Sequence, residues 1–478
     1  MTRYEGLRGL RAAIIGAARE GIALARFLAA QGARVTLSDA KSAETLGDAL
    51  GELEGLPIEL ALGGHPDSLL DVDVLFLSPG VPLEAPLVRE ARRRGLAISS
   101  EPRLFTQLCP APVVGVTGSS GKTTTTALIG EMLAAAGRKV WVGGNIGRPL
   151  IAELLTGERP DVAVMELSSF QLELFHADCQ GAATGQARSA ASRAVSLGGW
   201  SPQVAVVTNI TPNHLDRHAT MEAYIHAKAA IADYQRPGDW AVLNADDVQA
   251  AAFGGRTPAQ VAHFSLREPV AQGAMLRGET LWLRLANHDE AICERRELRL
   301  RGEHNVANVL AATCAAALAG AGMEAVRAVA TGFAGVAHRL EVVRRWRGIT
   351  FVNDSIATTP ERAIAALRAF DEPLVLLAGG RDKHLPWDEW AHWVQRKVRV
   401  VVAFGECAPL IEAALTKDTP EAPELQRAAD LEEAVSLAAG AAHAGDVVLL
   451  SPGGTSFDAF ADFEARGQAF RDLVRELD

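Results

Sequence analysis

A glycine-rich run that ends in lysine and threonines constrains this chain more than any other part of its sequence. Gly115 to Thr126 reads Gly-Val-Thr-Gly-Ser-Ser-Gly-Lys-Thr-Thr-Thr-Thr, preceded by apolar residues and followed from Ala127 by a helix-forming stretch. In such a strand, turn and helix, backbone N–H groups and the helix N-terminus bind phosphate, and the lysine reaches the terminal phosphates. The run predicts a site for a nucleoside triphosphate, the alternative being a turn that merely shares this composition.

The spacing of these glycines is narrower than in the general phosphate-loop pattern. The pattern G-x-x-x-x-G-K-[ST] requires glycine where this chain has Val116, and the glycines stand at 118 and 121 instead. The candidate residues for binding the phosphates are Gly118, Ser119, Ser120, Gly121, Lys122, Thr123 and Thr124. Lys122 is the candidate cation for the terminal phosphates, and the Thr123 hydroxyl is a candidate ligand for Mg²⁺.

Composition narrows the class of protein further. With 478 residues, 48% of them apolar and 22% charged, we expect about three globular domains. A net charge of -11 argues against general nucleic-acid binding. The five cysteines are widely spread without a C-x-x-C pair, which is typical of reduced thiols in the cytosol. We recognise no signal peptide and no bilayer-spanning stretch, and expect a soluble cytoplasmic protein without membrane insertion.

The N-terminal segment has the pattern of a Rossmann-like strand, helix and strand. A strand at residues 10–15 leads into the glycine loop Gly16–Gly21, and a second strand ends at Asp39. An acid at that distance suits a ribose or a base edge, so NAD binding is one interpretation. Ala18 occupies the position of the fingerprint's second glycine, which weakens that interpretation. A later strand delivers Gly80 to the same edge, where an ordinary turn is the alternative.

Polar side chains follow two strand-like runs of the central segment. Residues 162–169 and 204–217 each begin as a buried strand and continue into polar positions that include Glu166, His214 and Asp216. The ends of strands in a doubly wound sheet meet at one edge, here the edge that carries the phosphate loop. Oxygen and nitrogen ligands at that edge predict at least one Mg²⁺ ligand among these three residues.

The C-terminal segment repeats the strand, loop and helix pattern without another glycine-lysine cradle. It begins near His338 and carries strands at residues 350–352, 374–378 and 447–450, each followed by a polar loop. This pattern predicts a second binding domain that closes on the nucleotide site. We therefore expect an α/β fold of three domains: a Rossmann-like domain (1–98), a central domain with a mostly parallel, P-loop ATPase-like sheet (99–335) and a Rossmann-like domain (336–478).

Taken together, these motifs resemble those of the Mur ligases of peptidoglycan synthesis, over nearly the whole chain. The run Ser-Phe-Gln-Leu and the signature Ser451–Asp458 favour, within that family, the enzyme that adds D-glutamate. The other motifs that carry the resemblance are the T-G-x-x-G-K-T loop, Gly143–Gly147, Glu166–Leu172, Asn213–Arg217, Ala227–Lys228, His304–Asn305, His338–Arg339 and Asn353–Ser355.

The resemblance implies an ATP-dependent ligase that forms an amide bond. ATP would phosphorylate the carboxylate of UDP-N-acetylmuramoyl-L-alanine, and the amine of D-glutamate would attack the acyl phosphate. This order is chemically reasonable, because phosphate leaves well once metals and lysine neutralise its charge. The implied cofactors are ATP and two Mg²⁺ ions, and the implied form is a monomer. A folylpolyglutamate synthase or another Mur enzyme is the nearest alternative, and a NAD-dependent oxidoreductase is an alternative from another class.

The resemblance also assigns catalytic and metal-binding roles. The implied catalytic residues are Lys122, His214 and Lys228, and the implied metal ligands are Thr123, Glu166, His214 and Lys228. In the family the lysine at position 228 is carbamylated, which converts a cation into a carboxylate. Judged only as a lysine on a helix at residues 222–232, Lys228 would be expected at the surface.

The substrate-binding roles fall on all three predicted domains. Contacts to the base and ribose of ATP are implied for Asn305, Asn308, Arg339 and Asp354. Contacts to the UDP-linked substrate are implied for Arg19, Glu20, Asp39, Gly80 and Asn145. Contacts to D-glutamate are implied for Thr358, Lys383, Ser456 and Phe463, a set with the cation, hydroxyls and apolar wall that an amino diacid needs.

The chain departs from the family pattern at three places. Ser120 stands where asparagine is usual in the loop, and Ile356 stands where lysine is usual after Asn-Asp-Ser. Losing that lysine removes a positive charge on the side of ATP and the amino acid. Residues 180–199 form an insertion rich in Ala, Ser, Gly and Arg, for which we expect an outward, mobile loop and no function.

Overall fold

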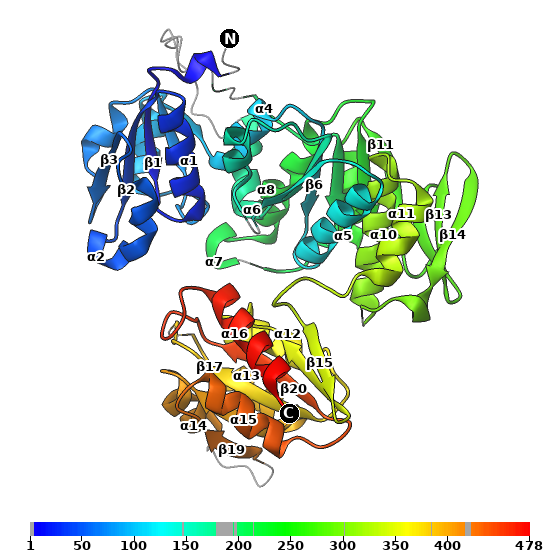
Figure 1. The fold of residues 1–478 in the computed structure, drawn as a ribbon. Helices are drawn as coiled ribbons and strands as arrows, with labels where there is room; N and C mark the ends of the chain where they lie inside the picture. Colours follow the sequence, from blue (N-terminus) through cyan, green and yellow to red (C-terminus); the bar gives the residue numbers. More distant parts are fainter. Residues whose placement is uncertain are drawn as a thin grey trace. The chain divides into compact units, whose positions relative to one another are not determined.

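Three sheets with helices between their strands make up the protein, seen here in a computed structural model (Figure 1). The structure describes residues 4–145, 148–177, 195, 198–213, 215–300, 302–383, 385–415 and 422–478. His214, the side chain of Asp216 and nearly all of the 180–199 insertion lie outside the described residues. The chain divides into two compact units, residues 1–298 with 303–332 and residues 299–302 with 333–478.

The first sheet is parallel throughout and has the strand order β3-β2-β1-β4-β5. The strand order reverses between the neighbours β1 and β4, because the chain continues from β1 to β2 on one side and from β4 to β5 on the other. This reversal creates a crevice at the carboxyl ends of β1 and β4. Its strands are β1 (Arg11–Ile15), β2 (Arg34–Asp39), β3 (Ile58–Leu62), β4 (Val74–Leu77) and β5 (Ala97–Ser99). Its helices are α1 (Arg19–Ala30), α2 (Ala43–Leu46), α3 (Pro86–Arg93) and α4 (Glu101–Leu108).

The second sheet has nine strands in the order β14-β13-β12-β11-β10-β9-β6-β8-β7. Only β12, β13 and β14 pair antiparallel, at one edge. The strands are β6 (Val113–Thr117), β7 (Val140–Gly144), β8 (Val162–Glu166), β9 (Val204–Val207), β10 (Trp240–Asn244), β11 (Gln260–Ser265), β12 (Gly273–Arg277), β13 (Thr280–Leu285) and β14 (His288–Glu294). The helices are α5 (Lys122–Ala135), α6 (Ser169–Leu172), α7 (Leu215–His218), α8 (Met221–Asp233), α9 (Val248–Ala251), α10 (Glu303–Leu318) and α11 (Met323–Gly332).

The third sheet has the order β15-β16-β20-β17-β18-β19, parallel except for the hairpin β15–β16. Its two faces bury separate apolar clusters, one beneath α12, α13 and α14 and the other beneath α15 and α16. The strands are β15 (Glu341–Trp346), β16 (Ile349–Asn353), β17 (Leu374–Gly379), β18 (Val398–Phe404), β19 (Glu424–Arg427) and β20 (Val447–Gly453). The helices are α12 (Pro360–Leu367), α13 (Asp388–Lys397), α14 (Ala408–Leu415), α15 (Leu431–Ala441) and α16 (Phe463–Glu476).

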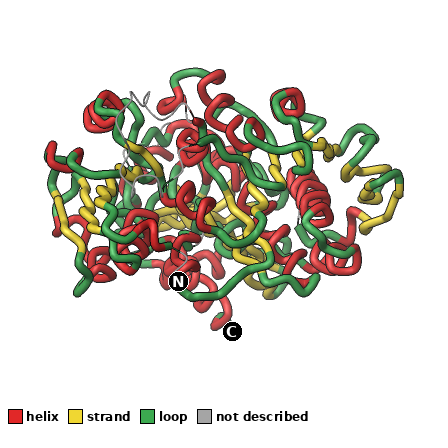
Figure 2. Tube along the Cα trace, turned by 90° about the horizontal axis from the view of Figure 1, so that it is seen from above, coloured by secondary structure: helices red, strands yellow, loops and turns green. Residues whose placement is uncertain are grey.

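The α/β fold class with mostly parallel sheets is therefore confirmed. Helices connect most of the parallel strands, and Figure 2 shows red helices and yellow strands intermixed. Parallel strands require such connections because each return crosses over the sheet. The domain limits at 98/99 and 335/336 stay predictions. Among the described residues, no helix combines the length and apolar character needed to cross a lipid bilayer.

Candidate active site

The glycine loop joins β6 to α5 and is shaped by two glycines. Gly118 and Gly121 have φ angles of 149° and 79°, which disfavour other residues. A Cβ at Gly118 would collide with the Thr208 hydroxyl, and one at Gly121 would collide with the side-chain oxygen of Asn308. The loop therefore needs glycine at both positions, and the shifted spacing read from the sequence has a structural cause.

Hydrogen bonds to the segment after β9 hold this loop in place. The Thr208 hydroxyl donates to the carbonyl of Ser120 at 2.6 Å, and the N–H of Ser120 donates to Asn209 Oδ1 at 2.9 Å. Ser119 Oγ donates to the carbonyl of Thr211 at 2.9 Å. The first turn of α5, with Thr123 and Thr124, follows directly. The loop is thus preorganised as a cradle for phosphate, since its donors need little rearrangement.

Two lysine amines meet at one carbonyl of the loop. Lys122 Nζ donates to the carbonyl of Gly118 at 3.1 Å, and Lys228 Nζ donates to the same carbonyl at 3.0 Å. Lys228 also donates to Thr117 Oγ1 at 3.2 Å and is only 1% exposed. Burial lowers the pKa of Lys228 well below its ordinary value, the charge of Lys122 adds to this, and Glu166 opposes it. The prediction that a lysine on this helix lies at the surface is wrong, because the Lys228 side chain extends from α8 beneath the phosphate loop.

A buried carboxylate at the end of β8 completes this part of the site. Glu166 is 2% exposed and accepts hydrogen bonds from Thr123 Oγ1 at 2.8 Å and from Asn145 Nδ2 at 2.9 Å. A hydroxyl and a carboxylate are the oxygen ligands that Mg²⁺ prefers, so Thr123 and Glu166 fit this ion. In the part of the chain that the structure describes, no three His, Cys, Asp or Glu side chains gather as a metal cluster. His214 lies outside that part, so its role as a ligand stays a prediction.

The two asparagines predicted to contact ATP lie beside the same loop. Asn308 on α10 is 6% exposed, and its side-chain oxygen accepts from Thr125 Oγ1 at 3.4 Å. Its amide donates to the side-chain oxygen of Asn305 at 3.1 Å. The structure thus places Asn308 next to Gly121 and Asn305 next to Asn308, although Asn305 alone would also suit a helix N-terminus.

A cavity of about 690 Å³ opens at the carboxyl ends of β1 and β4. It is the crevice at which ligands of open α/β sheets bind. All five residues predicted for the UDP-linked substrate line this cavity, namely Arg19, Glu20, Asp39, Gly80 and Asn145. Lys41 and His65 line it as well and were missed. His65 follows Gly63-Gly64 directly after β3, so the rule that functional residues follow strand ends would have found it.

Asp39 shapes the wall of this cavity. Its carboxylate accepts the N–H of Ala17 at 2.8 Å and the N–H of Lys41 at 2.9 Å, one on each oxygen. Ser38 Oγ lies 2.8 Å from His65 Nδ1 at the neighbouring position. Asp39 therefore fixes the turn after β1 and the segment after β2, which sets the shape of the cavity before any ligand contact is considered.

The Ser-Phe-Gln-Leu run ties the cavity to the central sheet. Gln171 Nε2 donates to Glu20 Oε1 at 2.7 Å, which connects α6 with α1. Burial raises the pKa of Glu20, and burial together with the charge of Glu20 raises the pKa of the neighbouring Glu101. Glu101 accepts the N–H of Ile151 at 2.8 Å. Glu20 thus lines the cavity, and the buried carboxyl group of Glu101 lies close enough for the charge of Glu20 to act on its pKa.

In the second unit, the residues predicted for D-glutamate surround two loops of the third sheet. Lys383 Nζ lies 3.5 Å from Thr358 Oγ1, and Ser456 is 2% exposed at the end of the Ser451–Asp458 signature. Phe463 begins α16, where its carbonyl accepts a hydrogen bond from Ser355 Oγ at 2.8 Å.

Arg466 holds these loops together and was missed in the sequence. It is fully buried and donates to Ser355 Oγ at 3.0 Å, to the carbonyl of Ser355 at 2.9 Å and to the carbonyl of Gly454 at 3.2 Å. It therefore fastens the loop after β16 to the loop after β20. Arg466 lies three residues after Phe463, so the two residues are neighbours on one face of α16. This spacing is the signal in the sequence that could have identified Arg466.

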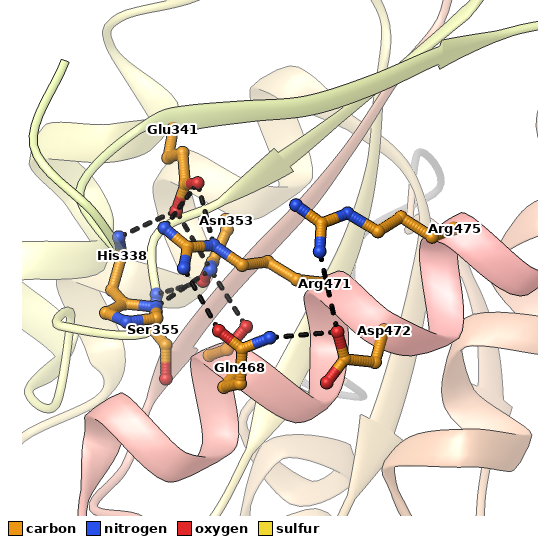
Figure 3. A network of polar contacts seen from close by, with 9 residues as sticks. His338, Glu341, Asn353, Ser355, Gln468, Arg471, Asp472 and Arg475 are labelled. Carbon is orange, nitrogen blue, oxygen red and sulfur yellow. Dashed lines mark hydrogen bonds and ion pairs between the residues drawn. The ribbon is translucent and has the colours of Figure 1, made fainter. Parts of the chain in front are cut away.

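Arg339 is flanked by two residues in the left-handed region. His338 has φ 61° and Leu340 has φ 44°, a conformation that costs non-glycine residues about 1–3 kcal/mol each. Figure 3 shows the network that holds this bend: the N–H of His338 donates to Glu341 Oε2 at 2.8 Å, and Asn353 Nδ2 lies 3.0 Å from His338 Nδ1. Arg471 Nε donates to Glu341 Oε1 at 2.8 Å. The network therefore holds Arg339 between two residues with an unfavourable backbone conformation.

Asp354 belongs to the same bend. Its Oδ1 accepts the N–H of Leu340 at 3.2 Å, and its Oδ2 accepts Ser451 Oγ–H at 3.0 Å. Burial raises the pKa of Asp354 to about 7, with those donors acting in the opposite direction. The structure therefore brings Arg339 and Asp354 together, as expected for two contacts to one nucleotide, although their roles stay predictions.

These domains and this phosphate site match a known class of ligase. Three family models match the chain: the MurD-like N-terminal domain at residues 11–100, the Mur ligase middle domain at 116–316 and the Mur ligase glutamate ligase domain at 338–454. Among solved structures, MurC from Thermotoga maritima shares the fold with a TM-score of 0.57 and 19% identity, covering 98% of this chain and 99% of that one. Escherichia coli FolC in complex with DHPP and ADP shares it with a TM-score of 0.52 and 18% identity, covering 78% and 91%.

The chain belongs to the Mur ligase family and is an ATP-dependent ligase, as its motifs predicted. Its relatives place it within one branch of that family. A UDP-N-acetylmuramoylalanine--D-glutamate ligase of Symbiobacterium thermophilum is 47% identical over 470 residues, covering 98% of each chain. The enzyme of the same name from Pelotomaculum thermopropionicum is 42% identical over 465 residues, covering 97% of each.

Proposed function

We propose that this ligase joins D-glutamate to UDP-N-acetylmuramoyl-L-alanine. The observation that carries the proposal is the hydrogen bond from Asn145, which lines the cavity, to Glu166, which also accepts from Thr123 of the phosphate site. A UDP-linked substrate in the cavity would thus end beside the γ-phosphate of ATP. The names of the relatives support this choice of substrates. ATP and UDP-linked precursors are cytoplasmic metabolites, so the proposed enzyme acts in the cytoplasm. We also propose that it acts as a monomer.

The proposed reaction has two balanced steps. A carboxylate oxygen of the muramoyl substrate attacks the γ-phosphorus, the bond to the bridging oxygen breaks, and ADP leaves with that electron pair. The amine of D-glutamate then attacks the acyl carbon, phosphate leaves and the nitrogen loses a proton. Lys122 lies within the loop and would stabilise the charge on the migrating phosphoryl group.

Residues of the phosphate site would bind the metal ion that the family requires. Thr123 and Glu166 would hold Mg²⁺, with His214 and Lys228 as further proposed ligands, and bound Mg²⁺ supplies neutralisation of phosphate charge. We propose that Lys228 is carbamylated: its neutral amine adds to CO₂, a C–N bond forms, a proton leaves, and two carbamate oxygens result. The lowered pKa of Lys228 supports this, because only the neutral amine adds to CO₂.

Phosphate release tests the proposed function directly. The full chain, ATP, Mg²⁺ and UDP-N-acetylmuramoyl-L-alanine are combined with D-glutamate, with L-glutamate, with other amino acids or with no acceptor. We expect release of phosphate only with D-glutamate. A parallel reaction contains folate and L-glutamate in place of the muramoyl nucleotide and D-glutamate. Release of phosphate there, and none with the muramoyl nucleotide, would assign the chain to a different ligase of the same chemistry.

The network around Arg339 yields a separate prediction. Asn353→Ala removes the amide that contacts His338, Glu341 and Gly467, so the bend should relax and the apparent KM for ATP should rise about fivefold or more. The KM for D-glutamate should change less. Gln468→Ala is the matched control, because this exposed residue contacts Arg471 in the same network without touching the bend (Figure 3). Equal changes in both KM values would indicate a general loss of structure instead.

A further inference from the structure

The loop that lacks the usual lysine is contacted by another cation. Ile356 carries no charge, but its carbonyl accepts the N–H of Thr358 at 2.8 Å and lies 3.5 Å from Nη1 of Arg362. The Arg362 side chain therefore reaches back six residues to the backbone carbonyl of Ile356. Lys383 Nζ lies 3.5 Å from Thr358 Oγ1 in the same short loop. Two cations thus converge on residues 356–358.

A cation is unfavourable at the position that Arg362 occupies in α12. Arg362 is exposed in the first turn of the helix, where its N–H is capped by Thr359 Oγ1 at 3.4 Å. The N-terminus of a helix carries partial positive charge, so a cation in the first turn is less favourable than a neutral residue. Arg362 therefore has a helix position that costs stability and a side chain that turns toward the loop.

The electrostatic influence of Arg362 extends to two of the predicted site residues. Its charge adds to burial in lowering the pKa of Lys383. Its charge also acts, together with that of Arg339, to lower the pKa of Asp354 against the larger effect of burial. The guanidinium group therefore lies near Asp354, which is predicted for ATP, and near Lys383, which is predicted for D-glutamate, and both lie within the second unit of the chain.

We propose that Arg362 supplies the positive charge absent at position 356 and, with Lys383, binds a carboxylate group of D-glutamate. This rests on the proposed function. D-Glutamate carries two carboxylates, and a guanidinium group binds a carboxylate through two parallel hydrogen bonds. Arg362 is thus a specificity residue for an acidic acceptor, provided by the helix after the loop instead of by the loop itself.

A pair of substitutions at positions 362 and 356 tests this proposal. Arg362→Ala should raise the apparent KM for D-glutamate about tenfold, with the KM for ATP nearly unchanged. Introducing the usual lysine in the same chain, as Ile356→Lys with Arg362→Ala, should recover most of that loss. Arg368→Ala is the matched control: it removes an exposed arginine at the other end of α12, where the guanidinium stacks on Trp393 at 4.3 Å.

The outcomes separate this proposal from the proposed function. An inactive wild-type chain would refute the function itself. An active wild type with an unchanged D-glutamate KM in Arg362→Ala would overturn the role of Arg362 alone. An increase confined to the ATP KM would also overturn it and would indicate a phosphate contact. A double variant with the same D-glutamate KM as Arg362→Ala would show that a lysine at position 356 does not replace the charge of Arg362.

Discussion

Replacing Lys122 with alanine is expected to lower kcat by about a thousandfold or more while the protein remains folded. The amine of Lys122 lies 3.1 Å from the carbonyl of Gly118, inside the loop where the terminal phosphates would bind. Removing one preorganised cation from a phosphoryl-transfer site typically costs 10³ to 10⁵ in rate, because the charge on the phosphoryl group is no longer balanced. Because the side chain contributes little packing, we expect the melting temperature to change by only about 2 °C.

The measurement is single-turnover and steady-state phosphate release with both substrates saturating. Lys139→Ala is the matched control: this lysine follows α5, pairs with Glu158 at 3.0 Å and is 49% exposed. Its replacement should leave kcat unchanged. A kcat for Lys122→Ala within about tenfold of the wild type would refute the assigned role, since a phosphate-neutralising cation contributes far more than that.

Replacing Lys228 is expected to lower kcat by roughly a hundredfold or more, for a different reason. The buried amine is linked to the phosphate loop through Gly118 and Thr117, and Glu166 acts on its pKa. Lys228→Met approximately keeps the volume and removes a buried polar group, a change that buried sites often tolerate with little loss of stability. Folding should therefore survive while the ligase reaction is lost.

Dependence on CO₂ separates a carbamylated lysine from a structural one. With its pKa lowered, Lys228 has more neutral amine near neutral pH than an ordinary lysine, and that form adds to CO₂. Wild-type turnover should fall when dissolved CO₂ is removed and recover when bicarbonate is added. Acetate should partly restore Lys228→Ala by supplying a carboxylate in the space left by the side chain. Wild-type activity that ignores CO₂ would indicate that the amine acts unmodified.

The sequence predicted the residues of the candidate site wherever those residues belong to short motifs. The glycine loop, Glu166 at the end of a buried strand, Asp39 and Gly80 follow from the rule that parallel strands end at one edge. The roles of Arg19, Glu20 and Asn145 came from the resemblance to the Mur ligases. The five residues predicted for the UDP-linked substrate line one cavity, although they come from segments more than a hundred positions apart. Short motifs and the family resemblance sufficed there because each residue lies at or shortly after the end of a strand.

Other features depend on contacts that no local pattern reveals. The burial of Lys228 follows from α8 packing beneath the phosphate loop, and a lysine in an amphipathic run is otherwise read as exposed. Arg466 fastens two loops about 100 residues apart in the chain to the start of α16. The link from Gln171 to Glu20 likewise spans two sheets. Such contacts are set by tertiary packing, so their partners are absent from any local window.

By itself the sequence determined the phosphate loop, the alternation of strands and helices, and hence an α/β fold with polar residues at its strand ends; the ligase activity followed from the resemblance of these motifs to those of the Mur ligases. These properties depend on backbone conformation and on hydrophobic periodicity, which act over a few residues. Only the tertiary structure decided which side chains lose water and which charges meet: Lys228 under the loop, Asn145 on Glu166, and Arg362 at the carbonyl of Ile356. Desolvation and Coulomb interactions depend on distance in space, which separation along the chain does not specify.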